Sequence, residues 1–170
     1  MSTANVGFAS TIPALFAPAF VRRNSFIELD ARGRAQSLMD SASWRELAGP
    51  FDRIESPWLP AQGITPQFDD GCVVLKGTIA GRPAVAVALD GGFQAGSTGE
   101  VSGAKMTTAL DLAAEDSRNG RQTAAVLLLE TGGVRLQEAN LGLAAIAEVT
   151  ASLLTLRQYA PVITVITGAY

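Results

Sequence analysis

The sequence has no histidine, a single cysteine and few charged side chains. Without histidine, the chain can supply neither a Ser-His-Asp nor a Cys-His nucleophile system, nor a metal site with histidine ligands. The lone cysteine, Cys72, cannot form a disulfide or a zinc cluster within the chain, and its strand-like setting favours a buried apolar role over a reactive thiol. We therefore expect no metal site, a reducing compartment and a cytoplasmic location.

Charged residues make up only 17% of the 170 residues, whereas apolar residues make up 48%. The 13 Lys and Arg residues against 16 Asp and Glu give a net charge of −3, and no basic cluster stands out, which argues against nucleic-acid binding. A charged fraction this low predicts that a partner chain covers part of the surface of an otherwise globular domain.

The first 24 residues differ from the rest of the sequence. The first 20 are apolar, but Pro13 and Pro18 interrupt them, and Arg22 and Arg23 follow the apolar run instead of preceding it. This order does not fit a signal peptide, and the prolines argue against a membrane-spanning helix. We predict an irregular arm over residues 1–24 and no association with a membrane.

Apolar periodicity and turn residues predict one α/β domain over residues 25–170. The expected elements are a helix over 25–39 with Ser25 and Glu28 as a capping box, a helical turn over 43–47, an ordered loop over 50–70, strands over 72–79 and 84–90, a helix over 101–117, a strand over 123–130, a helix over 134–158 and a strand over 162–167. The first two strands should form a hairpin, and the later strands should pair in parallel.

The last predicted helix is apolar on every side, which requires cover beyond its own sheet. The sequence then stops just past a strand, where an uncovered edge of a parallel sheet would be unusual. We therefore expect that another chain completes this layer, or that the sequence is part of a longer subunit.

Two adjacent glycines, Gly132 and Gly133, lie between a predicted strand and the helix predicted to start at residue 134. The start of a helix leaves backbone N–H groups unpaired at the positive end of the helix dipole. Gly132 and Gly133 are therefore candidate donors of an oxyanion hole, which stabilises an oxygen that becomes negative during a reaction. A tight turn that requires a positive φ explains the pair equally well.

A second glycine-rich loop contains Gly96, Ser97, Thr98 and Gly99. It matches neither the P-loop nor the dinucleotide-binding pattern, so a nucleotide phosphate cradle is not indicated. Its glycines would still let a ligand approach the backbone closely. We treat these four residues as candidate substrate-binding positions.

Three charged side chains lie near these two turns, and each has a structural alternative to a role in binding. Lys105 could meet a phosphate or carboxylate near a helix start, but pairing with a surface carboxylate is slightly favoured. The planar fork of Arg135 could bind a substrate carboxylate, although an ion pair with Glu138 three residues later is favoured. Glu130 could act as a general base, but capping of nearby amides is the simpler interpretation.

Such a site suits thioester enolate chemistry, which needs little from side chains. Loss of CO₂ from a malonyl thioester leaves an enolate oxygen, and one good backbone donor stabilises such an oxygen by roughly 3–4 kcal/mol. The absence of histidine is then no obstacle, although the sequence offers no obvious proton donor.

Long runs in the sequence resemble a known family. The runs Gly96–Lys105 (GSTGEVSGAK) and Glu130–Asn140 (ETGGVRLQEAN) are similar to the G-S-x-G…G-x-K stretch and the S-G-G-A-R-x-Q-E turn of acyl-CoA carboxyltransferases, in the carboxyltransferase branch of the crotonase superfamily. Together with Phe51–Pro60 (FDRIESPWLP), the second run resembles the β subunits of biotin-independent malonate decarboxylases. The likeness covers about Ser25 to the C-terminus.

This resemblance implies a crotonase-like (ClpP/crotonase) ββα spiral, present as a partial copy because family members continue past the last strand. It implies conversion of malonyl-S-acyl-carrier protein to acetyl-S-acyl-carrier protein and CO₂. Gly132 and Gly133 would donate to the oxyanion, and the loop over 96–99 would line the acyl-thioester pocket. The implied partners are a γ subunit of related fold and an acyl-carrier subunit with a CoA-like phosphopantetheine arm; this chain itself would bind no cofactor and no biotin.

Two other functions stay open. One is a carboxyltransferase subunit of a biotin-dependent acyl-CoA carboxylase, although bacterial acetyl-CoA versions commonly carry a four-cysteine zinc ribbon that Cys72 alone cannot form. The other is a non-catalytic scaffold, which the missing histidine and proton donor keep open.

Overall fold

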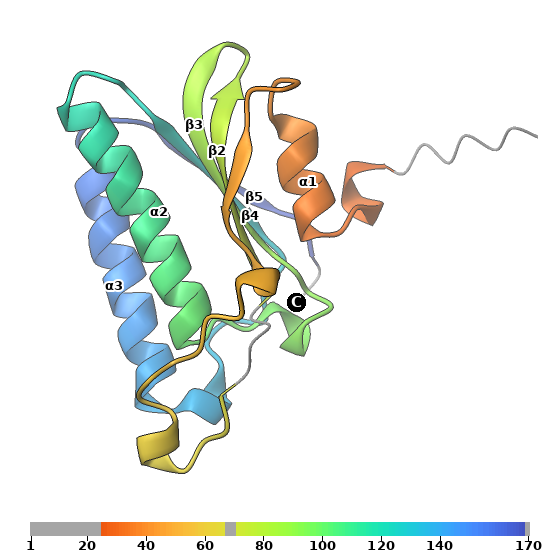
Figure 1. The fold of residues 1–170 in the computed structure, drawn as a ribbon, viewed down its shortest axis with the longest axis vertical. Coiled ribbons are helices and arrows are strands. Elements are labelled where there is room, and N and C mark those ends of the chain that lie inside the picture. Colours follow the sequence, from red (N-terminus) through yellow and green to blue (C-terminus); the bar gives the residue numbers. More distant parts are fainter. Residues whose placement is uncertain (1–24, 67–70, 169–170) are drawn as a thin grey trace, which may run out of the picture.

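The computed structural model describes residues 25–66 and 71–168, so the predicted arm over 1–24 lies outside the described residues. The strands are β1 (Arg45–Ala48), β2 (Cys72–Ile79), β3 (Arg82–Leu89), β4 (Ala124–Leu129) and β5 (Val162–Ile166); the helices are α1 (Ala31–Leu38), α2 (Glu100–Arg118) and α3 (Asn140–Leu156). The five strands form one sheet in sequence order, with α2 and α3 on one face and α1 on the other (Figure 1). None of the helices in these two ranges has the length and apolar character needed to cross a membrane.

The sheet is mixed. Strands β1, β2 and β3 pair antiparallel, whereas β3, β4 and β5 pair in parallel, with α2 and α3 as the two connections. Ala80 and Gly81, both with positive φ, form the tight turn between β2 and β3. The predicted α/β class, the hairpin and the parallel pairing are therefore confirmed.

Both faces of the central strands are buried, because successive residues of a strand point to opposite sides. On one side, Val85 and Val87 of β3 pack with Met106 and Leu110 of α2. On the other side, Ala86 and Ala88 of β3 belong to a cluster that includes Ala31 and Ala35 of α1. Cys72 is fully buried in the first of these clusters, as the sequence predicted.

Two predicted helices near the N-terminus are wrong. Residues 45–48 form β1, which pairs with β2 through Arg45 and Lys76, in place of the helical turn predicted over 43–47. The helix predicted over 25–39 is divided into a 3₁₀ turn (Phe26–Glu28) and α1, because extended residues intervene and Asp30 caps the new helix by accepting from the Gly33 N–H at 2.6 Å.

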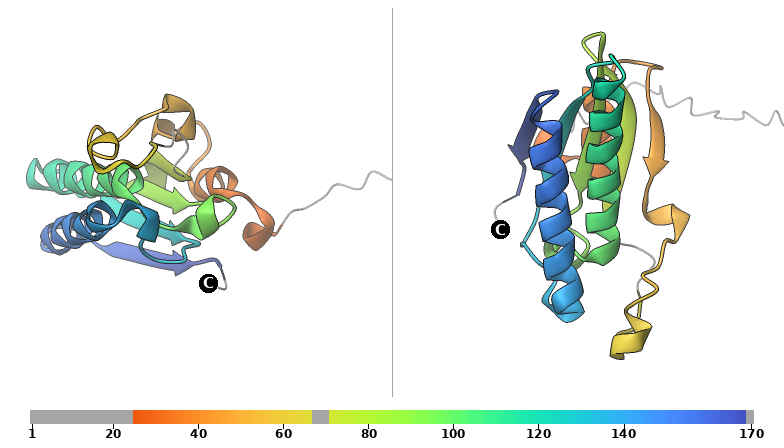
Figure 2. Two further views of the ribbon diagram at one scale, coloured as in Figure 1. Left: turned by 90° about the horizontal axis from the view of Figure 1, so that it is seen from below. Right: turned by 90° about the vertical axis from the view of Figure 1, so that its left-hand side faces the viewer.

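The third correction bears on the site. Helix α3 begins at Asn140 and not at residue 134, because Ala139 has a positive φ of 47° and the preceding residues form a loop with a 3₁₀ turn (Leu136–Glu138). Helix α3 lies along α2, as Figure 2 shows, and its Leu143 and Leu154 side chains are exposed. The helix is therefore apolar all round, as expected, and the partner expected to cover its outer side stays a prediction.

Candidate functional site

The two glycine-containing loops meet at the carboxyl ends of β3 and β4, the edge where parallel α/β sheets bind ligands. There the parallel pairing resumes beyond the strands: the Thr98 N–H donates to Gly133 O at 2.7 Å, and the Arg135 N–H donates to Thr98 O at 2.8 Å. The structure thus brings the predicted loop over 96–99 against the Thr131–Gly133 turn.

A tight bend precedes Ser97. Gln94, Ala95 and Gly96 have consecutive left-handed φ values of 44°, 54° and 66°. A Cβ on Gly96 would lie 1.8 Å from the Glu130 carbonyl oxygen, so only glycine permits this approach of the two loops. Left-handed residues other than glycine cost about 1–3 kcal/mol each and concentrate at functional sites. Periodicity gave no sign of this bend.

The premise for an oxyanion hole at the glycine pair is wrong in one respect. Since α3 starts at Asn140, neither glycine lies at a helix start. The Gly132 N–H donates to Ala95 O at 2.8 Å, and the Gly133 N–H contacts Thr131 Oγ1 at 3.1 Å. The alternative reading, a turn that needs a positive φ, is confirmed at Gly133, whose φ is 97°. A backbone bond therefore occupies the Gly132 amide, while only an exposed hydroxyl faces the Gly133 amide.

A different amide lies across this junction. Ala95 is exposed, and within residues 25–66 and 71–168 its N–H has no hydrogen-bond acceptor. Its carbonyl accepts from Gly132, which fixes the bend to the turn. The junction thus presents the Ala95 N–H and, if the Thr131 hydroxyl rotates away, the Gly133 N–H.

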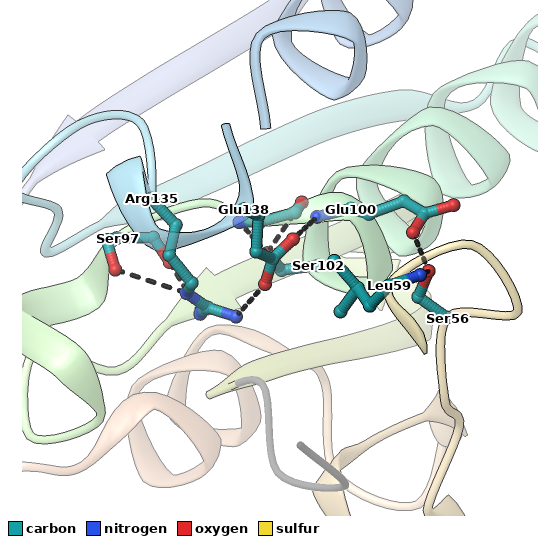
Figure 3. A network of polar contacts seen from close by, with 8 residues as sticks. Ser56, Leu59, Ser97, Glu100, Ser102, Arg135 and Glu138 are labelled. Atoms are coloured by element: carbon teal, nitrogen blue, oxygen red, sulfur yellow. Dashed lines mark hydrogen bonds and ion pairs between the residues drawn. The ribbon is translucent and has the colours of Figure 1, made fainter. Parts of the chain in front are cut away.

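Arg135 and Glu138 form an ion pair beneath the junction, with 2.9 Å between Nη1 and Oε1 (Figure 3). Both are almost fully buried, at 3% and 5% exposure. The other guanidinium nitrogens donate to Ser97, to its carbonyl oxygen at 2.7 Å and its hydroxyl at 3.3 Å, and the guanidinium lies over the Phe93 ring. The ion pair favoured from the sequence is confirmed, but its two residues precede helix α3 and do not lie on it. Because these contacts occupy the guanidinium, binding of a substrate carboxylate by Arg135 stays a prediction without structural support.

Glu138 also reaches the start of α2. Its Oε2 accepts from the Glu100 N–H at 2.6 Å, and a Cβ on Gly99 would lie 2.3 Å from its Oε1. The Gly99 N–H is in turn held by the Ser102 hydroxyl at 2.9 Å. Sequence reasoning assigned Glu138 only as a partner of Arg135 and did not find its contact with α2, which joins residues 38 positions apart.

The Glu100 carboxylate accepts a hydrogen bond from the Ser56 hydroxyl, which itself accepts from the Leu59 N–H (Figure 3). Burial raises the pKa of Glu100 above its ordinary value, and the negative charges of Glu138 and Glu148 raise it further. The loop over 50–66 is in this way tied to the same end of α2.

Lys105 and Glu130 lie in other surroundings. Lys105 is buried, and its Nζ donates to the carbonyl oxygens of Gly49 at 3.0 Å and Cys72 at 3.5 Å, so its contact with a substrate anion stays a prediction. Glu130 pairs with Arg34 at 2.5 Å, which links β4 to α1. The simpler interpretation of Glu130 as an amide cap is therefore wrong.

A cavity of about 330 Å³ opens beside the junction. Leu59 and Ile64 supply an apolar wall, and Gln94, Arg135 and Glu138 supply a polar one. This mixture suits a ligand with an apolar body and one polar end. Across the described ranges, no group of three or more Cys, Asp or Glu side chains could hold a metal ion.

The family model for the carboxyl transferase domain matches residues 28–170. The chain belongs to this family. The malonyl-S-ACP:biotin-protein carboxyltransferase MADC of Malonomonas rubra is 41% identical over 152 residues, which are 84% of this chain and 48% of that protein. This carboxyl transferase domain thus spans about half the length of the curated relative it matches.

Solved structures of malonate decarboxylases are also similar to this chain. A Pseudomonas malonate decarboxylase hetero-tetramer in complex with malonate contains a chain that is 62% identical, with a TM-score of 0.75, over 82% of this chain and 51% of that one. The Pseudomonas MdcD-MdcE hetero-dimer of malonate decarboxylase gives 54% identity and a TM-score of 0.68, over 82% and 53%. The crotonase-like fold and the resemblance to malonate decarboxylase subunits are therefore confirmed, and the two alternative functions have less support.

Proposed function

We propose that this carboxyl transferase domain is part of a malonate decarboxylase subunit, a carbon–carbon lyase that acts on a malonyl thioester. The observation that carries the proposal is the junction of the two loops at the ends of β3 and β4, in a chain 62% identical to one from a malonate decarboxylase. The substrate is malonyl-S-acyl-carrier protein, and the products are acetyl-S-acyl-carrier protein and CO₂.

In this reaction the bond between the malonyl carboxylate carbon and C2 breaks as CO₂ leaves. The electron pair of that bond moves toward the thioester carbonyl, whose oxygen becomes the enolate oxygen, and C2 later takes up a proton. We assign the Ala95 and Gly133 N–H groups as donors to this oxygen, in place of the predicted pair Gly132 and Gly133. One such donor lowers the barrier by roughly 3–4 kcal/mol.

The cavity of about 330 Å³ is the proposed place for the acyl end of the substrate. Leu59 and Ile64 would contact the apolar part of the phosphopantetheine arm, while the thioester reaches the bend over 94–96. Residues 96–99 would then contribute to the site by holding the loop backbone in position. The carrier brings the arm with it, so in this proposal the domain needs neither a resident cofactor nor biotin.

The active form in this proposal is a heteromeric complex with a γ subunit of related fold and the acyl-carrier subunit. Trp58 and Leu136 support it, because these large apolar side chains are 61% and 83% exposed and adjoin residues that line the cavity. Neither nucleic acid nor a membrane takes part, and the cytoplasmic location stays a prediction.

A second candidate is transfer of the carboxyl group to a biotin protein. The 41% identity to a malonyl-S-ACP:biotin-protein carboxyltransferase supports it, since that reaction also passes through a malonyl thioester. The two candidates differ in the acceptor of the carboxyl group and not in the oxyanion that the junction would stabilise.

The test is reconstitution of the full-length subunit with the proteins encoded beside it, followed by CO₂ release from malonyl-carrier with and without avidin. We expect release that requires both the subunit and its partner and that avidin does not inhibit. Inhibition by avidin would favour the biotin-protein acceptor. Full activity of the partner alone would contradict a catalytic role for this chain.

The scaffold alternative is tested with Gly133→Ala in the same complex. A Cβ there meets no atom within 4 Å, but the positive φ is strained, so the turn and its N–H should shift. We expect turnover to fall by roughly 10²–10³ while the complex still assembles. Loss of assembly with no separate effect on turnover would favour a scaffold.

A further inference from the structure

We propose that Arg135 and Glu138 are positioning residues, whose buried ion pair holds the bend over 94–96 against the Thr131–Gly133 turn. We call this pair the clamp. The inference rests on the proposed function, because the bend and the turn carry the amides assigned to the enolate oxygen. Both residues line the cavity, but the role proposed here acts through the loop backbone and not through contact with the substrate.

The clamp forms hydrogen bonds at both ends of the segment over 97–100, which follows the bend. Arg135 Nη2 donates to the Ser97 carbonyl at 2.7 Å, and Glu138 Oε2 accepts from the Glu100 N–H at 2.6 Å. Between these two points, the backbone of Thr98 pairs with Gly133 and Arg135. The loop after β3 is therefore fixed to the loop after β4 at successive positions.

The bend needs such restraint. Gln94 and Ala95 have left-handed backbones, which persist in residues other than glycine only where the surroundings enforce them. The Arg135 side chain contacts Ser97, which comes immediately after the bend. If that contact were lost, the strained residues could relax and the Ala95 N–H would change direction.

An ordinary ion pair between residues three apart does not explain the clamp. Such pairs stabilise exposed helices, whereas these side chains are buried and precede α3. Burying two charges requires that their remaining hydrogen-bonding atoms be satisfied. Here Ser97 and the Glu100 N–H satisfy them; Ser97 lies in the other loop, and Glu100 is the first residue of α2, which that loop enters. This division of contacts points to a role in joining the loops.

The test uses the full complex with Glu138→Gln and Arg135→Lys. The first keeps an acceptor for the Glu100 N–H but removes the charge; the second keeps the charge but removes the forked contact with Ser97. Asp116→Asn is the matched control, because it breaks the Lys76–Asp116 ion pair, of 2.7 Å, near the other end of α2. The measurements are kcat, KM and amide hydrogen exchange.

We expect both clamp variants to lower kcat by about 10²-fold with little change in KM, as for a misplaced catalytic group. Exchange at residues 96–100, whose amides are hydrogen-bonded, should become faster by about tenfold or more, as for loss of a hydrogen bond to a charged group, while exchange in β2 and β3 stays unchanged. The control variant should show neither effect. A double variant should be little worse than either single variant.

Unchanged exchange at residues 96–100 in both variants would overturn the proposal. Equal acceleration in β2 and β3 would also overturn it, because the pair would then serve general stability. A large rise in KM with unchanged exchange would instead mean that Arg135 binds substrate directly. Faster exchange confined to the loop, in a complex that releases no CO₂ even as wild type, would support the clamp and refute the proposed function.

Discussion

Gly96 lies where the backbones of the two loops approach each other closely. A Cβ at this position would lie 1.8 Å from the Glu130 carbonyl oxygen, and the φ of 66° is itself unfavourable for other residues. Backbone cannot move aside as the end of a side chain can. Glycine at this position is therefore a condition for the site and not only for the turn.

We predict that Gly96→Ala destabilises the domain by about 2–5 kcal/mol, the sum of overpacking and left-handed strain. Gly81→Ala is the control, because its φ of 74° is similar but no atom lies within 4 Å of its Cβ. It should cost only the strain, about 1–2 kcal/mol. Urea unfolding of both variants measures the difference, and equal losses would contradict the proposed close approach.

Glu100 should make stability depend on pH. Its raised pKa means that the folded state binds more protons than the unfolded chain between the ordinary carboxyl pKa and the folded value, so stability is lost as the pH rises through that window. Glu100→Gln, which keeps an acceptor for Ser56, should therefore increase the free energy of unfolding at neutral pH. The gain should vanish below the ordinary carboxyl pKa.

For Asp116→Asn we expect a change in stability in the opposite direction. Burial raises the pKa of Asp116, but hydrogen bonds from Lys76 and Thr123 outweigh it and hold this pKa below its usual range. The variant should lose stability at neutral pH, and the loss should shrink as the pH falls through the folded pKa. Unfolding curves measured between acidic and neutral pH check both variants. A destabilised Glu100→Gln at neutral pH would contradict the account.

At the scale of elements, the sequence predicted what depends on local pattern. The hairpin, α2, β4 and β5 follow from apolar runs and turn residues, and all are present. The errors at residues 43–47 and 134–139 arose where distant pairing decides the structure. Residues 45–48 pair with β2, and Val134 pairs with Thr98, neither of which local periodicity reveals.

The same reasoning explains which part of the site could be predicted. The resemblance implied one acyl-thioester site for Gly132, Gly133 and the loop over 96–99, but no local pattern in the sequence predicted how the two loops pair. The occupied Gly132 amide did not follow, because its acceptor, Ala95 O, depends on a left-handed bend. The contact between Glu138 and α2 joins elements whose relative placement only the folded chain defines.

The residue before helix α3 gives a testable prediction about stability. Ala139 has a φ of 47° and precedes the helix, so Ala139→Gly should relieve strain and raise stability by up to about 1 kcal/mol, after the entropy that glycine adds to the unfolded chain. Ala147→Gly, on the exposed side of α3, should cost about 1 kcal/mol. Thermal unfolding separates the two, and destabilisation by both would place the true helix start earlier.

At the scale of the whole molecule, two of the surfaces with exposed apolar side chains bear on assembly. One surrounds the outer side of α3 and the edge strand β5, with Leu143, Leu154 and Ile166, and the other lies beside the cavity, with Trp58 and Leu136. The low charged fraction of the sequence agrees with such surfaces. They are compatible with the heteromeric assembly that we propose.

The surface beside the cavity can be tested separately from the fold. Trp58→Ala together with Leu136→Ser should leave the unfolding midpoint nearly unchanged, because both side chains are exposed. The double variant should weaken assembly with the partner subunit by about 2 kcal/mol or more, as for an interface centred on a tryptophan. Titration calorimetry measures the affinity for the partner subunit. An unchanged affinity would show that this surface is not part of the interface.

The proposed reaction depends on which atoms meet the thioester oxygen. The most direct measurement is a crystal structure of the full complex with a stable malonyl-thioester analogue. We predict that the carbonyl oxygen of the analogue lies about 3 Å from the Ala95 and Gly133 nitrogens, with the Thr131 hydroxyl turned away. An analogue bound elsewhere, or bound while Thr131 still holds the Gly133 N–H, would contradict the account.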